Sequence, residues 1–333
     1  MTTAKTFNHI PLSVLDLAPV VEGGKPEQSF KNSVDLAQHV EKLGFHRYWF
    51  AEHHNMPGIA SSATSVIIGH IAGATNQMRI GAGGIMLPNH ATLAIAEQFG
   101  TLETMYPGRI DLGLGRAPGS DQAAAHALRR TLNMRVEDFP MQVDELQSYF
   151  EGTASVRAVP GEGLDIPIWL LGSSGFSAQL AAKKGLPFSF ASHFAPDYTI
   201  PALNLYRDNF KADVLDKPYA MVGVNVIAAD TDEKAEWLAT SQQQQFLSIR
   251  RGQPTKLQPP IDSLDEVWSP MERATVEQSL SSRSTIVGGP EKVKKGLEDF
   301  LNETQADEMI INSQIYNHED RVRSYEIVAE LFN

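Results

Sequence analysis

The sequence predicts an α/β fold in which eight strands and their helices close into a (β/α)8 TIM barrel. Short apolar runs alternate with longer amphipathic stretches, which is the pattern of a parallel sheet covered by helices. The runs are far enough apart for helical crossovers, and 333 residues suit a barrel that folds as a single domain over residues 1–333. The candidate strands, in chain order, are residues 10–15, 46–51, 79–87, 110–114, 166–171, 188–191, 220–228 and 308–312.

Helices are predicted between these strands. Residues 29–43 form an amphipathic stretch that ends at Gly44, and a glycine after the last turn is a common stop signal. Residues 62–74 are rich in small and apolar side chains, and residues 91–105 stop before a Pro-Gly pair. A longer helical stretch is expected over residues 121–150.

The region over residues 240–283 follows the seventh strand and breaks the regular spacing. It contains four consecutive glutamines at 242–245 and then Pro254, Pro259, Pro260 and Pro270. This composition resists regular structure and is typical of a mobile loop. We therefore predict an insertion over residues 240–283 that acts as a lid at the C-terminal rim of the barrel. The alternative is a fixed insertion that only enlarges the barrel.

Composition excludes several classes of function. The chain carries 28 Lys plus Arg against 40 Asp plus Glu, a formal charge of −12, which disfavours nucleic-acid binding. No apolar run approaches the roughly 20 residues that cross a bilayer. Residues 1–9 contain no apolar core of a secretory signal, so a cytoplasmic protein is expected. Cysteine is absent, which removes disulfides, thiolate nucleophiles and cysteine-based metal sites.

A pair of histidines follows the second strand, and the chemistry of a (β/α)8 barrel lies at such strand ends. Adjacent side chains of an extended segment point to opposite sides, so one of His53 and His54 is expected to face the barrel mouth. An imidazole there can act as a general acid or base, and Glu52 can add a charge or a hydrogen bond. The alternative is a polar strand exit without a catalytic role. No metal site is predicted, because the H-E-x-x-H order is missing.

A serine-rich run, residues 172–177 (GSSGFS), links the fifth strand to the next helix. Free backbone N–H groups at a helix start bind anions, and Ser173, Ser174 and Ser177 can donate hydroxyl hydrogen bonds. Arg116, which follows the fourth strand, can add a charge-assisted bond. We therefore predict a phosphate cradle. The alternatives are an ordinary serine N-cap and, for Arg116, a surface ion pair.

Glycines interrupt the otherwise apolar third strand at Gly81, Gly83 and Gly84. Glycine inside a strand indicates a bulge or the close approach of another group. Either a flat ring packs there, or the glycines relieve steric crowding within the barrel.

Three segments of the chain resemble the bacterial luciferase-like, flavin-dependent oxidoreductases, a family of (β/α)8 barrels. They are residues 44–54 (GFHRYWFAEHH), 80–88 (IGAGGIMLP) and 107–116 (PGRIDLGLGR). The run GSSGFS is similar to that of the single-chain, non-luminescent subgroup. The resemblance implies a monooxygenase that binds reduced FMN at the barrel mouth and, with O2, oxidises a small organic substrate through a C4a-peroxyflavin.

The resemblance also implies roles by position. His53 matches the active-site histidine, Gly83-Gly84 matches a non-prolyl cis peptide beneath the flavin ring, and Arg116 and Ser173 match phosphate contacts. Gly115 replaces a reactive cysteine, and Gly172 and Phe176 replace polar residues of the luciferase phosphate loop, so light emission is not expected. The candidate site is therefore His53 as the catalytic residue, with Gly83, Gly84, Arg116, Ser173, Ser174, Gly175, Phe176 and Ser177 as cofactor-binding residues.

Partners and alternatives follow from the same reasoning. No dinucleotide fingerprint is apparent, so reduced flavin is expected from a separate flavin reductase. Family members commonly dimerise, and the small and apolar faces of residues 62–74, beside residues 91–105, predict a homodimer through these helices. Burial within one chain is the alternative. For the function, the alternatives are an F420-dependent dehydrogenase and a non-catalytic flavin-binding protein.

Overall fold

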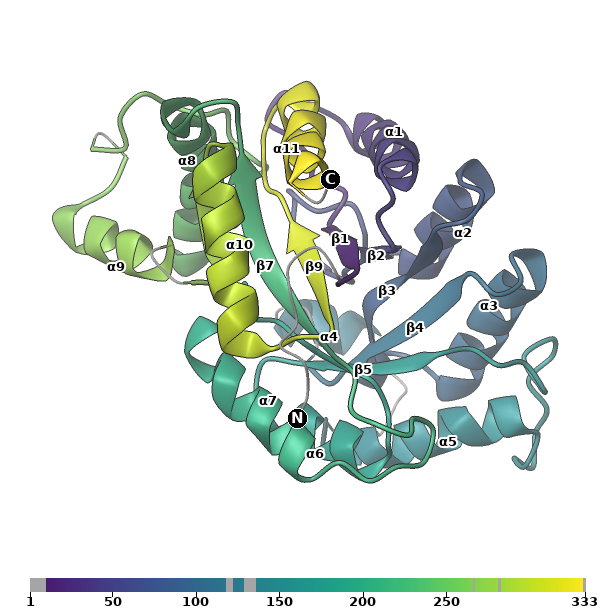
Figure 1. Cartoon of the computed structure of the whole chain (residues 1–333). Coiled ribbons are helices and arrows are strands. Elements are labelled where there is room, and N and C mark those ends of the chain that lie inside the picture. The colour runs from purple at the N-terminus through teal and green to yellow at the C-terminus, as the bar shows by residue number, and fades with distance from the viewer. Residues whose placement is uncertain (1–9, 118–121, 129–135, 266, 281–282, 332–333) are drawn as a thin grey trace.

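The computed structural model describes residues 10–117, 122–128, 136–265, 267–280 and 283–331. These residues form a closed parallel barrel surrounded by helices, which is the predicted α/β TIM barrel (Figure 1). The strands are β1 Leu12–Asp16, β2 Arg47–Phe50, β3 Arg79–Met86, β4 Ile110–Gly115, β5 Ile168–Gly172, β6 Phe188–Phe190, β7 Ala220–Ala228, β8 Thr285–Gly288 and β9 Glu308–Asn312.

Strands β1 to β6 pair in chain order, β9 pairs with β1 and β7, and the pairing of β6 with β7 closes the barrel. The barrel strands coincide with the eight predicted ones, which confirms that prediction. Strand β8 was not predicted. It pairs with β7 from Asn225 to Ala228, beyond the point where β9 leaves β7 at Asn225.

The helices cover the outside of the barrel. In the described residues they are α1 Pro26–Lys42, α2 Thr64–Ala74, α3 Thr92–Met105, α4 Gln122–Leu128, α5 Phe139–Glu151, α6 Gly175–Lys183, α7 Thr199–Asp208, α8 Asp232–Arg250, α9 Pro270–Leu280, α10 Pro290–Thr304 and α11 His318–Glu330. Among the helices described here, none combines the length and apolarity that a membrane span requires.

Helices α1, α2 and α3 begin and end within a few residues of their predicted ends. Helix α1 begins at Pro26, three residues before its predicted start, because proline fits the first turn where its missing N–H is not needed. Gly44 follows α1 with a φ of +85°, the left-handed conformation of a stop glycine. Within the stretch expected over residues 121–150, the described residues form α4 and α5, with a short 3-10 turn over Val136–Asp138 before α5; residues 121 and 129–135 lie outside the described residues.

The interior of the barrel holds two kinds of layer. Trp49, Trp169, Met221 and Ile310 pack in an apolar layer on alternate, inward-facing strand positions. At the amino ends of the strands lies a charged network in which Arg47 binds two buried carboxylates. Its guanidinium lies 2.7 Å from Asp111 Oδ2 and 2.9 Å from Glu308 Oε1. These two layers fill the barrel toward the amino ends of the strands, and Leu15, Trp49 and Ile310 of the apolar layer form the floor of a cavity toward the carboxyl ends.

The prediction that glutamines 242–245 resist regular structure is wrong, because they lie inside α8 (Figure 1). Two physical reasons account for the helix. Thr231 caps its start, with a side chain that accepts a hydrogen bond from the N–H of Lys234, and glutamine is itself a good helix former. Leu238 packs in a buried cluster with Ile227 of β7, and Leu247 is also buried. The prolines all follow the helix rather than interrupt it.

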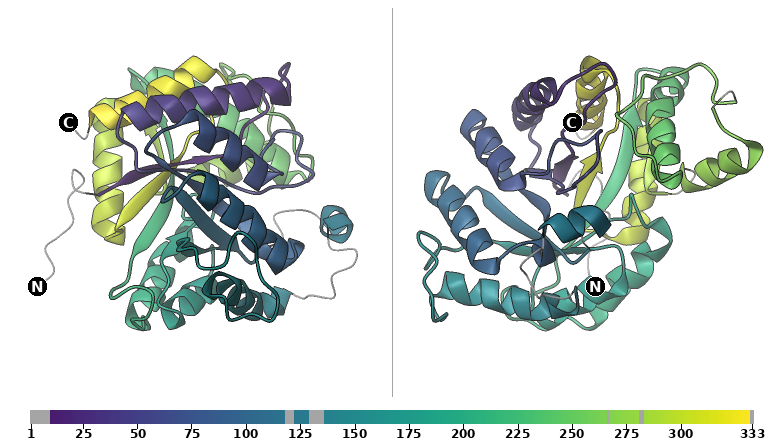
Figure 2. Two further views of the ribbon diagram at one scale, coloured as in Figure 1. Left: turned by 90° about the vertical axis from the view of Figure 1, so that its right-hand side faces the viewer. Right: turned by 180° about the vertical axis from the view of Figure 1, so that it is seen from behind.

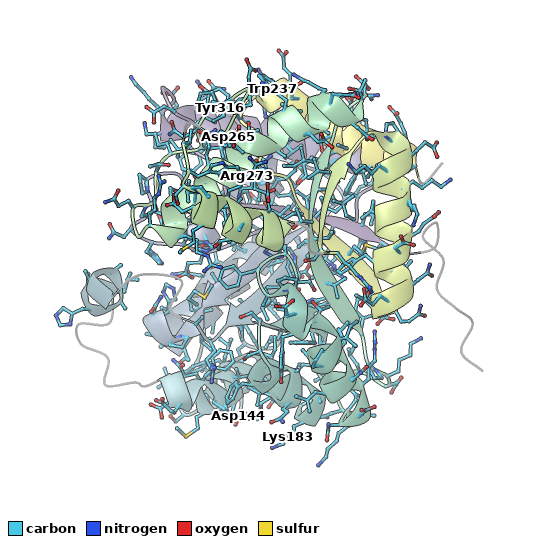
Figure 3. The ribbon with its side chains drawn as sticks, turned by 90° about the vertical axis from the view of Figure 1, so that its left-hand side faces the viewer. Asp144, Lys183, Trp237, Asp265, Arg273 and Tyr316 are labelled. Atoms are coloured by element: carbon cyan, nitrogen blue, oxygen red, sulfur yellow. The ribbon has the colours of Figure 1, made fainter. Side chains whose placement is uncertain are left out.

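Residues 253–261, which we call the strap, run from α8 back across the barrel to the loop after β1. Leu257 N–H donates to Val20 O at 3.0 Å, and Glu22 N–H donates to Leu257 O at 2.8 Å. Helix α9 then projects from the molecule (Figure 2). Figure 3 shows Asp265 and Arg273 near this helix; their side chains form an ion pair at 2.7 Å. The region predicted as a lid is therefore a helix, a strap and a second helix.

Candidate functional site

A cavity of about 450 Å³ lies at the carboxyl ends of the barrel strands. Most of the predicted site residues line it, namely His53, Gly83, Gly84, Arg116, Ser173, Ser174 and Ser177. Gly175 and Phe176 do not contribute to the lining, although Phe176 contacts Arg116. The structure thus brings together residues that come from the ends of β2, β3, β4 and β5.

The serine-rich run forms the start of α6. Ser174 stands at the N-cap position, and its side chain makes no capping hydrogen bond. The N–H groups of the first helical turn have no partner within the helix and are available to an anion. Strand β4 pairs with β5 up to Gly115 and Leu171, which places Arg116 beside this helix start.

Arg116 is held over an aromatic ring. Its guanidinium carbon lies 4.1 Å from the centre of the Phe176 ring, a distance at which the ring attracts a cation. Among the described residues, no carboxylate forms an ion pair with Arg116. The alternative role for Arg116, a surface ion pair, therefore has no partner in this part of the chain. A cation, an uncapped helix start and two serines converge on one end of the cavity, which is a suitable donor set for a phosphate.

The glycines of β3 permit close packing. A Cβ atom on Gly81 would lie 2.5 Å from Asp111 O, and one on Gly84 would lie 2.7 Å from Gly113 O. The absence of side chains at these glycines therefore relieves steric crowding within the barrel, which was one of the two alternatives for the glycines of this strand. The bond between Gly83 and Gly84 is a cis peptide. Since both glycines line the cavity without side chains, they also leave a flat surface on which an aromatic ring could pack.

Glu52 fixes the second histidine of the pair. Its buried carboxylate lies 2.7 Å from His54 Nε2 and 2.9 Å from His90 Nε2, and it accepts the N–H of Met86 at 3.0 Å. Burial raises the pKa of Glu52, but these hydrogen bonds outweigh it and lower the pKa to about 2. His54 is therefore a structural partner of a permanently ionised carboxylate.

His53 is the histidine that faces the cavity, as the alternation of side chains predicted for one of the two. Its Nδ1 atom is buried and has no hydrogen-bond partner among the described residues. Burial lowers the pKa of His53, so the imidazole is neutral at neutral pH. A neutral imidazole with a free nitrogen in a cavity can accept a proton from a ligand.

A second histidine, His193, was missed by the sequence reasoning. It follows β6 and lines the same cavity, with a buried Nδ1 that has no partner among the described residues. Burial, and then the proximity of His53, lower the pKa of His193 to about 4. The strand-end rule that selected His53 also applies to His193 and is the signal that could have found it.

Amide side chains form another part of the lining that was missed. Asn312 Nδ2 donates to Asn225 Oδ1 at 3.0 Å, on neighbouring strands β9 and β7. Gln242 and Gln245 reach the cavity from α8. Their spacing of three residues, which repeats once per helical turn, is the signal that could have placed them on one face of a helix. Within the described residues, no group of three or more metal-ligating side chains occurs.

Comparison with known proteins agrees with the barrel fold. A luciferase-like monooxygenase, the name carried by a protein of Escherichia coli K12, is 55% identical over 330 residues, which cover 98% of both chains. An N-acetyl-S-alkylcysteine monooxygenase of Bacillus subtilis is 31% identical over 332 residues, which cover 96% of this chain and 98% of the relative. The crystal structure of apo-MsnO8 superposes with a TM-score of 0.88 at 32% identity, over 97% of this chain and 98% of that one.

More distant structures share the fold and differ in cofactor. The oxygenating constituent of 3,6-diketocamphane monooxygenase from Pseudomonas putida, in complex with FMN, gives a TM-score of 0.71 at 16% identity, over 97% of each chain. An F420-dependent secondary alcohol dehydrogenase gives 0.70 at 12% identity, over 97% of this chain and 99% of that one. At these identities the likeness shows the shared fold, so the chain is a TIM-barrel protein with a cavity at the carboxyl ends of its strands.

The family itself follows from its sequence profile. The profile described as luciferase-like monooxygenase matches residues 10–308. The chain belongs to the luciferase-like monooxygenase family.

Proposed function

We propose that the protein is an FMN-dependent monooxygenase that uses reduced FMN and O2 to oxidise a small organic substrate. One observation carries the proposal: Arg116 has no carboxylate partner among the described residues and lies beside the uncapped start of α6 at one end of the cavity. A single phosphate group would satisfy both the cation and the free N–H groups. Relatives named as monooxygenases support the reaction class.

Two parts of the cavity lining suit FMN, one its phosphate and the other its ring. Arg116, Ser173, Ser174 and the backbone N–H groups at the start of α6 would bind the phosphate. Gly83-Gly84 would face the flat ring, because both glycines line the cavity without a side chain of their own. When bound in its reduced form, FMN supplies the electrons that activate O2.

His53 is the residue that would handle a proton beside the ring. It is neutral, it faces the cavity, and its Nδ1 is buried without a partner among the described residues. The protein would otherwise bind, orient and exclude water from the reacting groups. A non-catalytic flavin-binding protein would not need such an imidazole in its cavity.

The charges of the cavity favour FMN over F420, the alternative cofactor. Among the described residues that line it, Arg116 is the one permanent positive charge. A single cation and a helix start match the terminal phosphate of FMN, whereas the longer anionic tail of F420 would place further negative charges where the described lining offers no cation.

Two partners belong to the proposal. Reduced FMN would come from a separate flavin reductase, since the sequence contains no dinucleotide fingerprint. A second copy of the chain would pack against α2 and α3 to form a homodimer.

The strap, with α8 and α9, would cover the cavity as a lid that excludes water.

The reaction can be tested by following isotopically labelled oxygen. The protein is supplied with FMN, a flavin reductase, NADH and 18O2, and the product is examined by mass spectrometry. Thioethers are the first substrates to try, because the Bacillus subtilis relative is named for an S-alkylcysteine. We expect one labelled oxygen atom in the product with FMN and none when reduced F420 replaces it. Oxidation of the substrate without O2, with oxidised F420 as the hydride acceptor, or a product without labelled oxygen in the presence of FMN, would contradict the proposal.

A further inference from the structure

One face of α8 forms a wall of the cavity. Gln242, Gln245, Phe246 and Ile249 all line the cavity, and their spacing of three, four and seven residues places them along one stripe of an α-helix. The neighbouring Gln244 points elsewhere, since its Nε2 donates to Thr240 O at 3.2 Å and Pro259 O at 2.9 Å. We call these four residues the amide wall.

The two glutamines of the amide wall lack partners. Their side chains are each 9% exposed, and the buried Oε1 atoms of Gln242 and Gln245 have no hydrogen-bond partner among the described residues. Buried polar groups are nearly always paired, and an unpaired one costs free energy. Since an amide can rotate to exchange its oxygen and nitrogen, each glutamine offers both an acceptor and a donor to a ligand.

The remaining charge in the cavity restricts that ligand. Apart from Arg116, which the proposed function assigns to a phosphate, the described lining contains no permanent charge. His53 and His193 are neutral because burial lowers the pKa of each. A charged ligand group would lose its hydration without gaining a counter-ion, which is costly. An uncharged polar group is therefore the complement of the amide wall.

The rest of the wall is apolar and reaches the cavity mouth. Phe246 and Ile249 lie one turn from the two glutamines, and Phe194 also lines the cavity. Phe194 is 78% exposed and Ile249 is 47% exposed. Large apolar side chains exposed together at a cavity mouth indicate a surface that an apolar ligand covers.

We propose that the amide wall is the substrate-binding surface, and that it selects uncharged molecules in which an amide or hydroxyl group is attached to an apolar body. Gln242 and Gln245 would bind the polar group, and Phe246 and Ile249 would contact the apolar body. The proposal rests on the proposed function in one respect, that the cavity accepts a substrate beside the cofactor.

The test is a series of six-carbon probes that differ only in the head group: hexanamide, hexan-1-ol, hexanoate and hexylammonium. Their dissociation constants are measured by saturation-transfer NMR on the full chain, with and without FMN. We expect hexanamide and hexanol to bind at least about tenfold more tightly than the two ions. Equal affinities, tighter binding of either ion, or no binding of any probe would overturn the proposal.

Substitutions locate the binding surface. Gln242→Leu and Gln245→Leu keep the size and helix preference of the side chain but remove its amide, and each should weaken hexanamide binding about tenfold. Gln243→Leu is the matched control, because Gln243 lies in the same run but does not line the cavity. Unchanged hexanamide affinity in both wall variants would overturn the proposal, and circular dichroism checks that each variant is folded.

A separate measurement distinguishes this inference from the proposed function. FMN affinity is followed by the quenching of flavin fluorescence in the native protein and the three variants, and we expect no change among them. If the native protein did not bind FMN, the proposed function would fail, while the head-group preference measured without FMN would still decide the role of the amide wall.

Discussion

His53 and His193 are two neutral imidazoles at one cavity. The low pKa of His193, about 4, also has a consequence for stability. In the unfolded chain the same group titrates near 6.5, so the unfolded state binds more protons between these two values. The folded state is therefore favoured above pH 6.5, and this contribution is lost as the pH falls toward 4.

The substitution His193→Gln tests this directly. From the two pKa values, the native protein should lose about 2 kcal/mol of unfolding free energy through this group between pH 7 and pH 5. Urea titrations at both pH values, without FMN, measure the loss. We expect the loss in the native protein to exceed that of the variant by about 2 kcal/mol. Equal losses would contradict a folded-state imidazole of His193 that stays neutral at pH 5.

The sequence could predict the histidine site only in part. Side chains alternate along an extended segment, which predicted that one of His53 and His54 faces the barrel mouth. Which of the two does so depends on where β2 ends, and the family resemblance was needed to choose His53. His54 could not be assigned, because its role depends on Glu52 and on His90, which lies far along the chain. Contacts of this kind are not visible in a local pattern.

At the scale of elements, apolar runs were a sufficient guide to the eight barrel strands because those strands are buried on both faces. Strand β8 was missed because its residues are only alternately buried, so it lacks the continuous apolar run of a strand buried on both faces. The glutamines of α8 were misassigned because composition was judged without the Thr231 cap and the buried leucines. Gln242 and Gln245 were therefore expected in a loop, whereas α8 places them in the wall of the cavity.

The strap provides the prediction for the lid. Its backbone is held to the loop after β1 by Leu257, outside the barrel sheet. If the strap opens independently, the N–H of Leu257 should exchange with deuterium faster than the N–H of Val224 in β7, and added FMN should slow it. Hydrogen exchange with mass spectrometry measures both. Exchange as slow as that of β7, and unaffected by FMN, would indicate the fixed insertion instead.

At the scale of the whole molecule, α2 and α3 carry an outer surface with few charges. Helix α2 contains no Asp, Glu, Lys or Arg, and its Val66 is 71% exposed. Met105, at the end of α3, is 58% exposed. Barrel helices normally present charged side chains to solvent, and exposed apolar side chains on adjacent helices favour contact with another copy of the chain.

The homodimer prediction is tested by Val66→Glu. We expect light scattering at micromolar concentration to give a dimer mass for the native protein and a monomer mass for Val66→Glu, because a charge would be buried without a partner in the interface. Met271→Glu is the control, since Met271 is 79% exposed on α9, a helix that packs against α8 rather than against α2 or α3. A native protein that is monomeric under these conditions would rule the dimer out.

The central claim is that one end of the cavity binds the phosphate of FMN, and calorimetric titration with FMN and riboflavin tests it most directly. Losing a charge-assisted hydrogen bond costs about 1.5–3 kcal/mol, so FMN should bind roughly ten- to a hundredfold more tightly than riboflavin. Arg116→Ala should abolish most of this preference, whereas Arg157→Ala, at an exposed ion pair with Glu162, should retain it. Equal affinities of the native protein for FMN and riboflavin would contradict the claim.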